Sequence, residues 1–264
     1  MTKSRLDLLL AERGLFESRS RAAAAIMAGQ VRLGEGGARA GKPGQMVPED
    51  VPVSVDRGDE YVSRGGVKLA NALDAFGVDV AGRRAVDAGA STGGFTDVLL
   101  RRGAEHVVAV DVAYGELHWR LREDPRVTAL ERVNVRSLDC ESLPYRPDLI
   151  VADLSFISLR KVMPALLACA AAEFDSLALV KPQFELERGR VGKGGVVRDA
   201  ADRRSALVAV ANAARGMGCA VRGFASSGLP GPAGNRESFV WLAHAGAPGE
   251  VEDVESAAAE VEPS

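Results

Sequence analysis

The sequence RAVDAGASTGGF, residues 84–95, decides the fold because it joins a predicted buried strand to a predicted helix through a glycine-rich turn. A ligand can approach the backbone of such a turn closely only where the side chains are small. The spacing G-x-x-x-G-G differs from the G-x-G-x-x-G of dinucleotide sites, and no Gly-Lys-Ser/Thr follows as it would in a P-loop. We therefore expect a nucleoside ligand without a pyrophosphate. A tight turn that binds nothing and an NAD site are the alternatives.

Strands and helices alternate along the chain after this turn. Apolar runs typical of buried parallel strands are separated by longer helical patterns. After the strand at 84–88, the predicted strands cover residues 106–112, 148–154, 177–180, 220–225 and 238–243, and the predicted helices cover 93–102, 116–122, 159–172 and 200–215. This order predicts an α/β fold with a Rossmann-like, mostly parallel sheet, whose ligands bind beyond the carboxyl ends of the strands.

The two ends of the chain differ from this pattern in structure and in charge. Two short helices, over residues 5–13 and 18–28, and a few small strands precede the α/β region. Residues 1–48 hold eight Lys/Arg and four Asp/Glu, whereas residues 250–264 hold six acidic residues and no basic one. The predicted domains are a small basic α+β domain at 1–58, a linker at 59–63, the α/β domain at 64–247, and an acidic, disordered tail at 248–264.

The composition is that of an ordinary globular protein, with 47% hydrophobic and 26% charged residues. Cys140, Cys169 and Cys219 are odd in number and form no C-x-x-C pair, which argues against a disulfide framework and a cysteine zinc site. No apolar run reaches the roughly 20 residues that a membrane-spanning helix needs. We expect a cytoplasmic protein with no membrane partner and no metal.

Three polar residues lie where they could hold a nucleoside ligand. Asp111, near the end of the second strand, could accept hydrogen bonds from both ribose hydroxyls. Asp87 could meet a cationic methionine amine, and Asn134, in an expected third strand, could meet the adenine edge. S-adenosylmethionine is the common ligand of this kind. The predicted cofactor-binding residues are Asp87, Gly89, Ser91, Thr92, Gly93, Gly94, Phe95, Asp111 and Asn134.

Four charged residues are expected at one rim of this fold. Lys68 lies on a helix before the first strand, Asp153 and Lys181 end two later strands, and Glu237 precedes the last one. Taken singly, each could be a solvated surface charge. Lys181, followed by a proline, could simply end its strand, and Asp153 could cap the next helix.

These residues lie within the motifs SRGG-x-KL, DAG-x-STGGFTD, ADLSFISL, KPQFE and GNRESF. Together the motifs closely resemble the TlyA family, and the similarity runs from about residue 5 to residue 243. The resemblance implies an FtsJ-like class I methyltransferase domain with a seven-stranded sheet, preceded by an S4 RNA-binding domain. It also implies 2′-O-methylation of cytidine in ribosomal RNA, with 23S as the expected substrate, 16S as a second candidate, and S-adenosylmethionine as the donor. An old haemolysin label belongs to the same family.

In this family a Lys-Asp-Lys-Glu tetrad carries the methyl transfer, and Lys68, Asp153, Lys181 and Glu237 match it. A ribose hydroxyl is a poor nucleophile until its proton can leave, and in-line positioning supplies much of the acceleration. A lysine becomes a general base only when its pKa drops toward neutrality, which burial and a second ammonium favour. We expect Lys181 to be the base and Lys68 its neighbouring cation.

The stretch GLFESRSRA, residues 14–22, resembles the S4 signature. The residues predicted to contact RNA are Arg5, Arg13, Arg19, Arg21 and Lys42, and such contacts position the enzyme more than they select a sequence. The sequence GEGG at residues 34–37 departs from the usual Asn-Gly turn of the family and puts one loop contact in doubt.

Several alternatives stay open. The protein could be a non-catalytic RNA-binding factor, an S4-bearing pseudouridine synthase, or a pore-forming cytolysin. The turn at residues 156–158 could touch the target nucleotide, although packing is the preferred interpretation, and Tyr61 could relay RNA binding to the cofactor turn. The methylated nucleotide and the oligomeric state, monomer or dimer, are left undecided.

Overall fold

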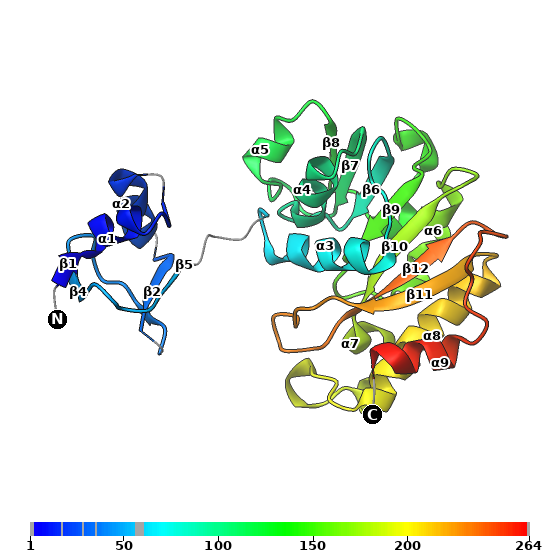
Figure 1. The fold of residues 1–264 in the computed structure, drawn as a ribbon. Coiled ribbons are helices and arrows are strands. Elements are labelled where there is room, and N and C mark those ends of the chain that lie inside the picture. The colour runs from blue at the N-terminus through cyan, green and yellow to red at the C-terminus, as the bar shows by residue number, and fades with distance from the viewer. Residues whose placement is uncertain (1–2, 17, 28, 35, 56–60, 263–264) are drawn as a thin grey trace. The chain divides into compact units, whose positions relative to one another are not determined.

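The computed structural model describes residues 3–16, 18–27, 29–34, 36–55 and 61–262 (Figure 1). The chain divides into two compact units, residues 1–60 and 61–264. Each unit has its own hydrophobic core, as expected of an independent domain. The linker expected at residues 59–63 falls partly outside the described residues.

The first unit is a small α+β domain. Its elements are β1 (Lys3–Arg5), α1 (Leu6–Glu12), α2 (Arg19–Met27), β2 (Val31–Leu33), β3 (Ala38–Arg39), β4 (Met46–Pro48) and β5 (Val53–Val55). β1 pairs with β4, and β2 lies between β3 and β5, all antiparallel. The backbone N–H of Arg21 donates to the Ser18 hydroxyl (3.2 Å), as expected where α2 begins. The core is small and centres on Leu6, Leu10 and Val31.

The second unit is built on a seven-stranded sheet. Its strands are β6 (Arg84–Ala88), β7 (His106–Asp111), β8 (Val127–Glu131), β9 (Leu149–Ala152), β10 (Asp175–Val180), β11 (Ala220–Ser226) and β12 (Ser238–Ala243). The order across the sheet is β11-β12-β10-β9-β6-β7-β8, and β12 runs antiparallel to both of its neighbours while the other pairs are parallel. The predicted mostly parallel α/β fold is therefore confirmed.

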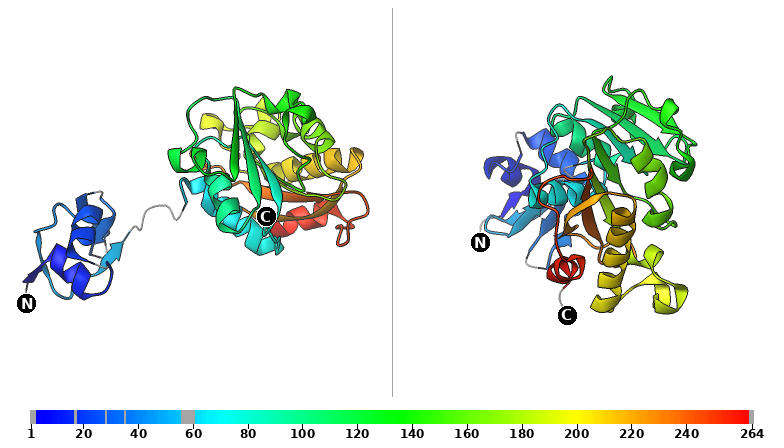
Figure 2. Two further views of the ribbon diagram at one scale, coloured as in Figure 1. Left: turned by 90° about the horizontal axis from the view of Figure 1, so that it is seen from above. Right: turned by 90° about the vertical axis from the view of Figure 1, so that its right-hand side faces the viewer.

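Helices cover both faces of this sheet (Figures 1 and 2). One core packs the sheet against α3 (Arg64–Phe76), α4 (Gly94–Arg101) and the segment that carries α5 (Trp119–Arg122). The other packs it against α6 (Met163–Ala168), α8 (Ala200–Gly216) and α9 (Val254–Val261). The short helix α7 (Pro182–Glu185) follows β10 directly. Because helices cover both faces of the sheet, a ligand site is expected beyond the carboxyl ends of the strands.

The carboxyl-terminal tail corrects one prediction, because it contains helix α9 where disorder was expected. Asp253 caps the helix by accepting the N–H of Glu255 (2.9 Å). Val254 and Ala258, four residues apart, are buried on the same side of the helix. The carboxylate of Glu262 pairs with Arg203 of α8 (2.7 Å), and both side chains are buried. The acidic composition suggested disorder, but the acidic residues within the helix lie on its solvent side and its apolar residues pack on the domain.

A second correction concerns the cysteines. Cys140 and Cys169 form a disulfide, with Cα atoms 4.9 Å apart, although the odd cysteine count argued against one. The two lie 29 residues apart in sequence, and only the packing of α6 against the segment after β8 brings them together. Cys219 is free and buried, and burial raises the pKa of its thiol. Among the described residues, none of the helices is long and apolar enough to cross a membrane.

Candidate active site

The site lies at the carboxyl edge of the sheet. Asp153 directly follows β9 and Lys181 directly follows β10, and these two strands are parallel neighbours. Glu237 directly precedes β12, whose first residue, Ser238, pairs with Val180 at the end of β10. Lys181 and Glu237 therefore flank a paired position, and residues opposite each other in adjacent strands lie about 5 Å apart. The sheet brings three of the four predicted residues to one edge.

The fourth residue, Lys68, reaches this edge from α3. Its Nζ forms a short ion pair with Oε2 of Glu237, and the side chains are only 8% and 1% exposed. A Cβ on Gly231 would strike the Glu237 carboxylate, so the backbone of that loop closes over the pair. Removing one partner of a buried ion pair leaves an uncompensated charge. Lys68 and Glu237 thus form one tightly held unit.

Lys181 and Asp153 form a second ion pair, with Nζ and Oδ1 2.5 Å apart. Lys181 also donates a hydrogen bond to the hydroxyl of Ser155 (3.0 Å). This pair is more open than the first, because the Asp153 side chain is 23% exposed and that of Lys181 is 11% exposed. The two lysines are almost equally buried, so the difference between the pairs lies in the carboxylates, with Asp153 the more open one. Asp153 does not cap the following helix, since Ser158 does so.

The glycine-rich turn differs in detail from the expectation. Ser91 and Thr92 are exposed, but Gly93, Gly94 and Phe95 are buried. Phe95 packs against Phe239 inside the domain, with ring centroids 5.8 Å apart. Their burial does not test the prediction that these three residues line the cofactor site, which stays a prediction.

The space next to the glycines is filled by the protein itself. A Cβ on Gly89 would lie 2.5 Å from the carbonyl oxygen of Asp153, and one on Gly94 would strike the Ser63 hydroxyl. A Cβ on Gly93 would strike Leu121 of α5. These glycines are needed for close packing of the chain at the turn, and Gly89 holds the turn directly against the segment that carries Asp153.

Asp87 is fully buried at the end of β6. Its Oδ2 accepts hydrogen bonds from the Thr96 amide (2.9 Å) and hydroxyl (2.7 Å). Its Oδ1 is buried and has no hydrogen-bond partner among the described residues. Burial raises the pKa of Asp87 to about 7, the Thr96 hydrogen bonds oppose that rise, and repulsion from Asp153 and Asp111 adds to it. An orphaned acceptor of this kind fits a cationic ligand group.

Asp111 holds the turn from the other side. Its two oxygens accept the backbone N–H of Ser91 (2.7 Å) and of Ala113 (2.8 Å). Ser91 has a φ of 46°, a strained value for a residue with a side chain, and the bond to Asp111 compensates for it. A narrow crevice lies here, lined by Ser91, Asp111 and Glu131 among others. Each carboxylate oxygen keeps a second lone pair for a ligand hydroxyl.

Asn134 is not in a strand, because β8 ends at Glu131. It is exposed and its side chain accepts the N–H of Arg136 (3.0 Å), so that it begins a short 3-10 helix, Val135–Ser137. The apolar pattern around it comes from Val133 and Val135, which pack against the core beyond the strand. The prediction that Asn134 lies in the third strand was therefore wrong, because that strand ends before it.

The loop after Asp153 presents an exposed aromatic ring. Phe156 is 91% exposed and has a φ of 64°, and its ring centroid lies 5.3 Å from that of Phe184. Packing, the preferred interpretation of the turn at residues 156–158, holds for Ile157, which packs against the core, but not for the ring of Phe156. The buried carboxylate of Glu185 fixes this loop by accepting from the Ser158 hydroxyl (2.6 Å) and the Leu159 N–H (2.6 Å).

Sequence reasoning missed Ser155 and Glu185, although both lie within quoted motifs. Ser155 belongs to ADLSFISL and Glu185 to KPQFE. The signal that could have identified both is that each is a polar residue among apolar ones in its motif. Among the described residues, no group of three or more potential metal ligands comes together.

The basic residues of the first unit are partly committed to its own fold. Arg5 and Arg19 both donate to the buried carboxylate of Asp7, which keeps the pKa of that carboxyl far below its usual value. Arg13 donates to the backbone carbonyls of Val51 (2.9 Å) and Glu49. Arg21 and Lys42 are exposed. Tyr61, by contrast, packs within the second unit, against Gly66 and beneath Arg101.

Comparison with known proteins gives the two units separate families. Residues 61–244 match the FtsJ-like methyltransferase model, and residues 4–51 match the S4 domain model. The chain is 53% identical over 242 residues to a Mycobacterium tuberculosis protein named 16S/23S rRNA (cytidine-2'-O)-methyltransferase TlyA, covering 91% of this chain and 90% of that one.

Other relatives carry the haemolysin name. Hemolysin A of Brachyspira hyodysenteriae is 40% identical over 200 residues, covering 74% of this chain and 81% of that one. A solved structure from Streptococcus thermophilus, also named as a hemolysin, superposes with a TM-score of 0.74 at 38% identity, covering 98% of this chain and 96% of that one. With an S4 domain followed by an FtsJ-like methyltransferase domain, the chain belongs to the TlyA family.

Proposed function

We propose that the protein transfers a methyl group from S-adenosylmethionine to the 2′-hydroxyl of a cytidine in 23S ribosomal RNA, with 16S ribosomal RNA as a second candidate substrate. The observation that carries the proposal is the pair of Lys–carboxylate contacts, Lys68–Glu237 and Lys181–Asp153, at one edge of the sheet. The similarity to a named ribosomal RNA cytidine-2'-O-methyltransferase over nine-tenths of the chain supports the substrate class.

Lys181 acts as the general base in this proposal. When bound, the cofactor supplies an electrophilic methyl group on a sulfonium. Lys181 would first have to release the proton that it holds in the ion pair with Asp153; as the neutral amine it would then accept the proton of the ribose hydroxyl, so that the oxygen could take up the methyl group. Asp153 then stabilises the ammonium that Lys181 becomes.

Lys68 and Glu237 position the hydroxyl. Glu237 can accept a hydrogen bond on the oxygen not held by Lys68, and the Lys68 ammonium stabilises negative charge that develops on the ribose oxygen. Both side chains are nearly buried, so the arrangement is fixed before the substrate binds. Pre-organisation of this kind lowers the cost of reaching the transition state.

The cofactor residues of the proposal are Asp87, Ser91, Thr92 and Asp111. Asp87 would receive the methionine amine on its unpartnered Oδ1, and Asp111 the ribose hydroxyls on its remaining lone pairs. Gly89 acts indirectly, by letting this turn lie against the segment of Asp153.

The S4 domain brings the ribosomal RNA to the enzyme. Arg21 and Lys42 are its exposed basic residues in this role, while Arg5, Arg13 and Arg19 combine structural contacts with the N–H groups that they have left. Ribosomal subunits are thus the proposed partners, and the cytoplasm is the proposed location.

The test uses purified protein, tritiated S-adenosylmethionine, and separated ribosomal subunits from cells that lack the protein. We expect label in 2′-O-methylcytidine from the large subunit, and the small subunit answers the 16S question separately. Label on a base instead of a ribose, or RNA binding without any transfer, would contradict the proposal. Lysis of red cells by the purified protein would favour the haemolysin alternative.

A further inference from the structure

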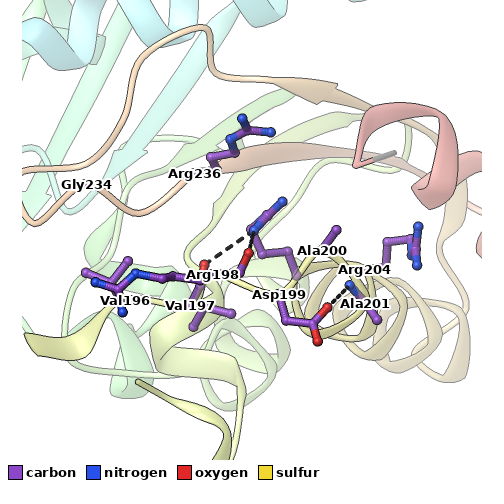
Figure 3. A pocket seen from close by; sticks show the side chains of 10 residues that line it. Val196, Val197, Arg198, Asp199, Ala200, Ala201, Arg204, Gly234 and Arg236 are labelled. Carbon is purple, nitrogen blue, oxygen red and sulfur yellow. Dashed lines mark hydrogen bonds between the residues drawn. The ribbon is translucent and has the colours of Figure 1, made fainter. Parts of the chain in front are cut away.

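A charged hollow lies beside the candidate active site, where α8 begins. It has a volume of about 660 Å³ and is lined by residues 196–201, by Gly234 and Arg236, and by the first turn of α8 (Figure 3). Its lining residues include four arginines and one carboxylate, which are Arg198, Arg203, Arg204, Arg236 and Asp199. The surplus of guanidinium groups suits an anionic ligand.

Two of these arginines are already engaged by the tail of the chain. Arg203 is buried against the carboxylate of Glu262 (2.7 Å), and Arg204 donates to the backbone oxygen of Glu262 (3.1 Å). Asp199 accepts the N–H of Ala201 (2.8 Å) and so caps the helix with its own carboxylate. The end of the helix is therefore not the feature that would bind an anion.

Arg198 and Arg236 are the remaining two. Both are exposed, and neither has a carboxylate within ion-pair distance among the described residues. Figure 3 shows their side chains projecting from two different segments around the hollow. Two guanidinium groups with no acidic partner among the described residues keep their N–H donors for phosphate oxygens.

The buried side chain of Asn235 fixes both segments. Its Oδ1 accepts the N–H of Val197 (2.8 Å), its Nδ2 donates to the carbonyl of Gly195 (2.8 Å), and it is 1% exposed. The Asn235 side chain thus links Val197, the chain neighbour of Arg198, to the segment that carries Arg236. A buried and satisfied amide of this kind specifies a single loop arrangement.

The same segment carries the catalytic Glu237. Glu237 is 2% exposed and faces Lys68, whereas its chain neighbour Arg236 is exposed. Arg236 therefore directly precedes Glu237, the residue that we propose holds the ribose. RNA whose ribose sits at Glu237 would carry its phosphates past this neighbour.

We propose that Arg198 and Arg236 form a subsite for the phosphodiester backbone of the RNA, next to the nucleotide that is methylated. The inference rests on the proposed function for its substrate. The contacts fix where the strand lies and carry no sequence information. They belong to the methyltransferase domain and add to whatever the S4 domain contributes.

The test compares the wild type with R198A/R236A in the full-length protein, using ribosomal subunits from cells that lack the protein. Binding is measured over a range of salt concentrations, and methyl transfer over a range of subunit concentrations. Each lost phosphate contact should reduce the slope of log K against log salt by about 0.7–0.9, so the double variant should lose about 1.4–1.8. The KM should rise about tenfold or more, while kcat at saturation stays within about twofold.

R84A is the matched control, because Arg84 is an exposed arginine at the opposite, amino-terminal end of β6. It should keep the wild-type slope and KM. The single variants R198A and R236A should each reduce the slope by about 0.7–0.9, half of the decrease in the double variant, and R198K/R236K should keep the wild-type slope because the charge is kept. The single variants also give a result if the double variant proves unstable.

A salt slope and KM of R198A/R236A equal to those of R84A would overturn the subsite. Inorganic phosphate, exchanged for chloride at constant ionic strength, provides a second arm: it should compete with the RNA phosphates and reduce the difference between wild type and R198A/R236A, and a difference that high phosphate leaves unchanged would contradict a subsite that recognises phosphate. Because the slope measures binding, a wild type that binds but does not methylate would contradict the proposed function and leave the subsite intact.

Discussion

Replacing Asp87 with asparagine should change the pH dependence of stability in a predictable direction. The pKa of Asp87 is about 7 in the folded protein against 3.8 for the free side chain, because the buried carboxylate has lost its hydration. Roughly three pKa units correspond to about 4 kcal/mol of cost for the ionised form. Asparagine keeps an oxygen for the Thr96 hydrogen bonds and carries no charge.

The sign follows from which state holds the proton. Between about pH 4 and pH 7 the folded protein keeps the Asp87 proton and the unfolded chain has released it, so stability falls as pH rises and levels off above about 7. The amide NH2 of the variant would lie where Oδ1 has no partner, which costs about 1–3 kcal/mol at every pH. D87N should therefore be less stable than wild type near pH 4 and about 1–3 kcal/mol more stable above pH 7.

Urea unfolding, followed by tryptophan fluorescence at fixed ionic strength, measures this difference. Both tryptophans, Trp119 and Trp241, lie in the methyltransferase unit and report on its unfolding. D79N, which removes an exposed carboxylate, is the control and should follow the wild-type pH profile. A D87N profile parallel to that of the wild type would refute the reasoning.

The same variant tests the cofactor contact. A charged hydrogen bond from a methionine amine to Asp87 should contribute about 1.5–3 kcal/mol, so D87N should bind S-adenosylmethionine about 10- to 150-fold more weakly. Wild-type affinity should rise with pH and level off above about 7, because the carboxylate must ionise to meet a cation. Calorimetry that finds equal affinities would remove Asp87 from the cofactor site.

Three further predictions concern the RNA and the tail. F156A should raise the KM for ribosomal subunits by about 5- to 150-fold, since an exposed ring that stacks on a base is worth about 1–3 kcal/mol, and an unchanged KM would show that the ring does not touch RNA. E262Q should destabilise the methyltransferase unit by about 3–5 kcal/mol because buried Arg203 loses its charged partner, and unchanged urea unfolding would mean that the tail is not docked in solution. Deleting residues 1–58 should weaken RNA binding and reduce its salt dependence while leaving cofactor affinity unchanged, and equal RNA affinity of the two proteins would exclude the S4 domain from substrate binding.

The sequence was informative where local pattern and chain direction determine position. Asp153 and Lys181 end neighbouring parallel strands, so their meeting at one edge follows from the apolar runs before them. Lys68 and Glu237, by contrast, are 169 residues apart, and their joint placement came from the family motifs. The pairing of each lysine with its own carboxylate could not be read from spacing, because it depends on side-chain packing between α3 and the loop before β12.

Other features could not be predicted from the sequence because they also depend on tertiary packing. Phe95 lies in a turn that the motif links to a cofactor, yet its ring completes the core beside Phe239. Helix α9 owes its order to a single buried face and one ion pair, while its composition is that of a solvated tail. The Cys140–Cys169 disulfide depends on a tertiary approach of two segments that no spacing rule encodes.

The most direct test of the two Lys–carboxylate pairs as the methyl-transfer site is single-turnover methylation of ribosomal subunits by K181M, with K161M, at an exposed lysine, as the control. We expect K181M to lose at least about a thousandfold in rate, on the scale of a missing general base, while its affinity for S-adenosylmethionine matches that of K161M. A K181M rate within about tenfold of the control would show that Lys181 does not take the proton.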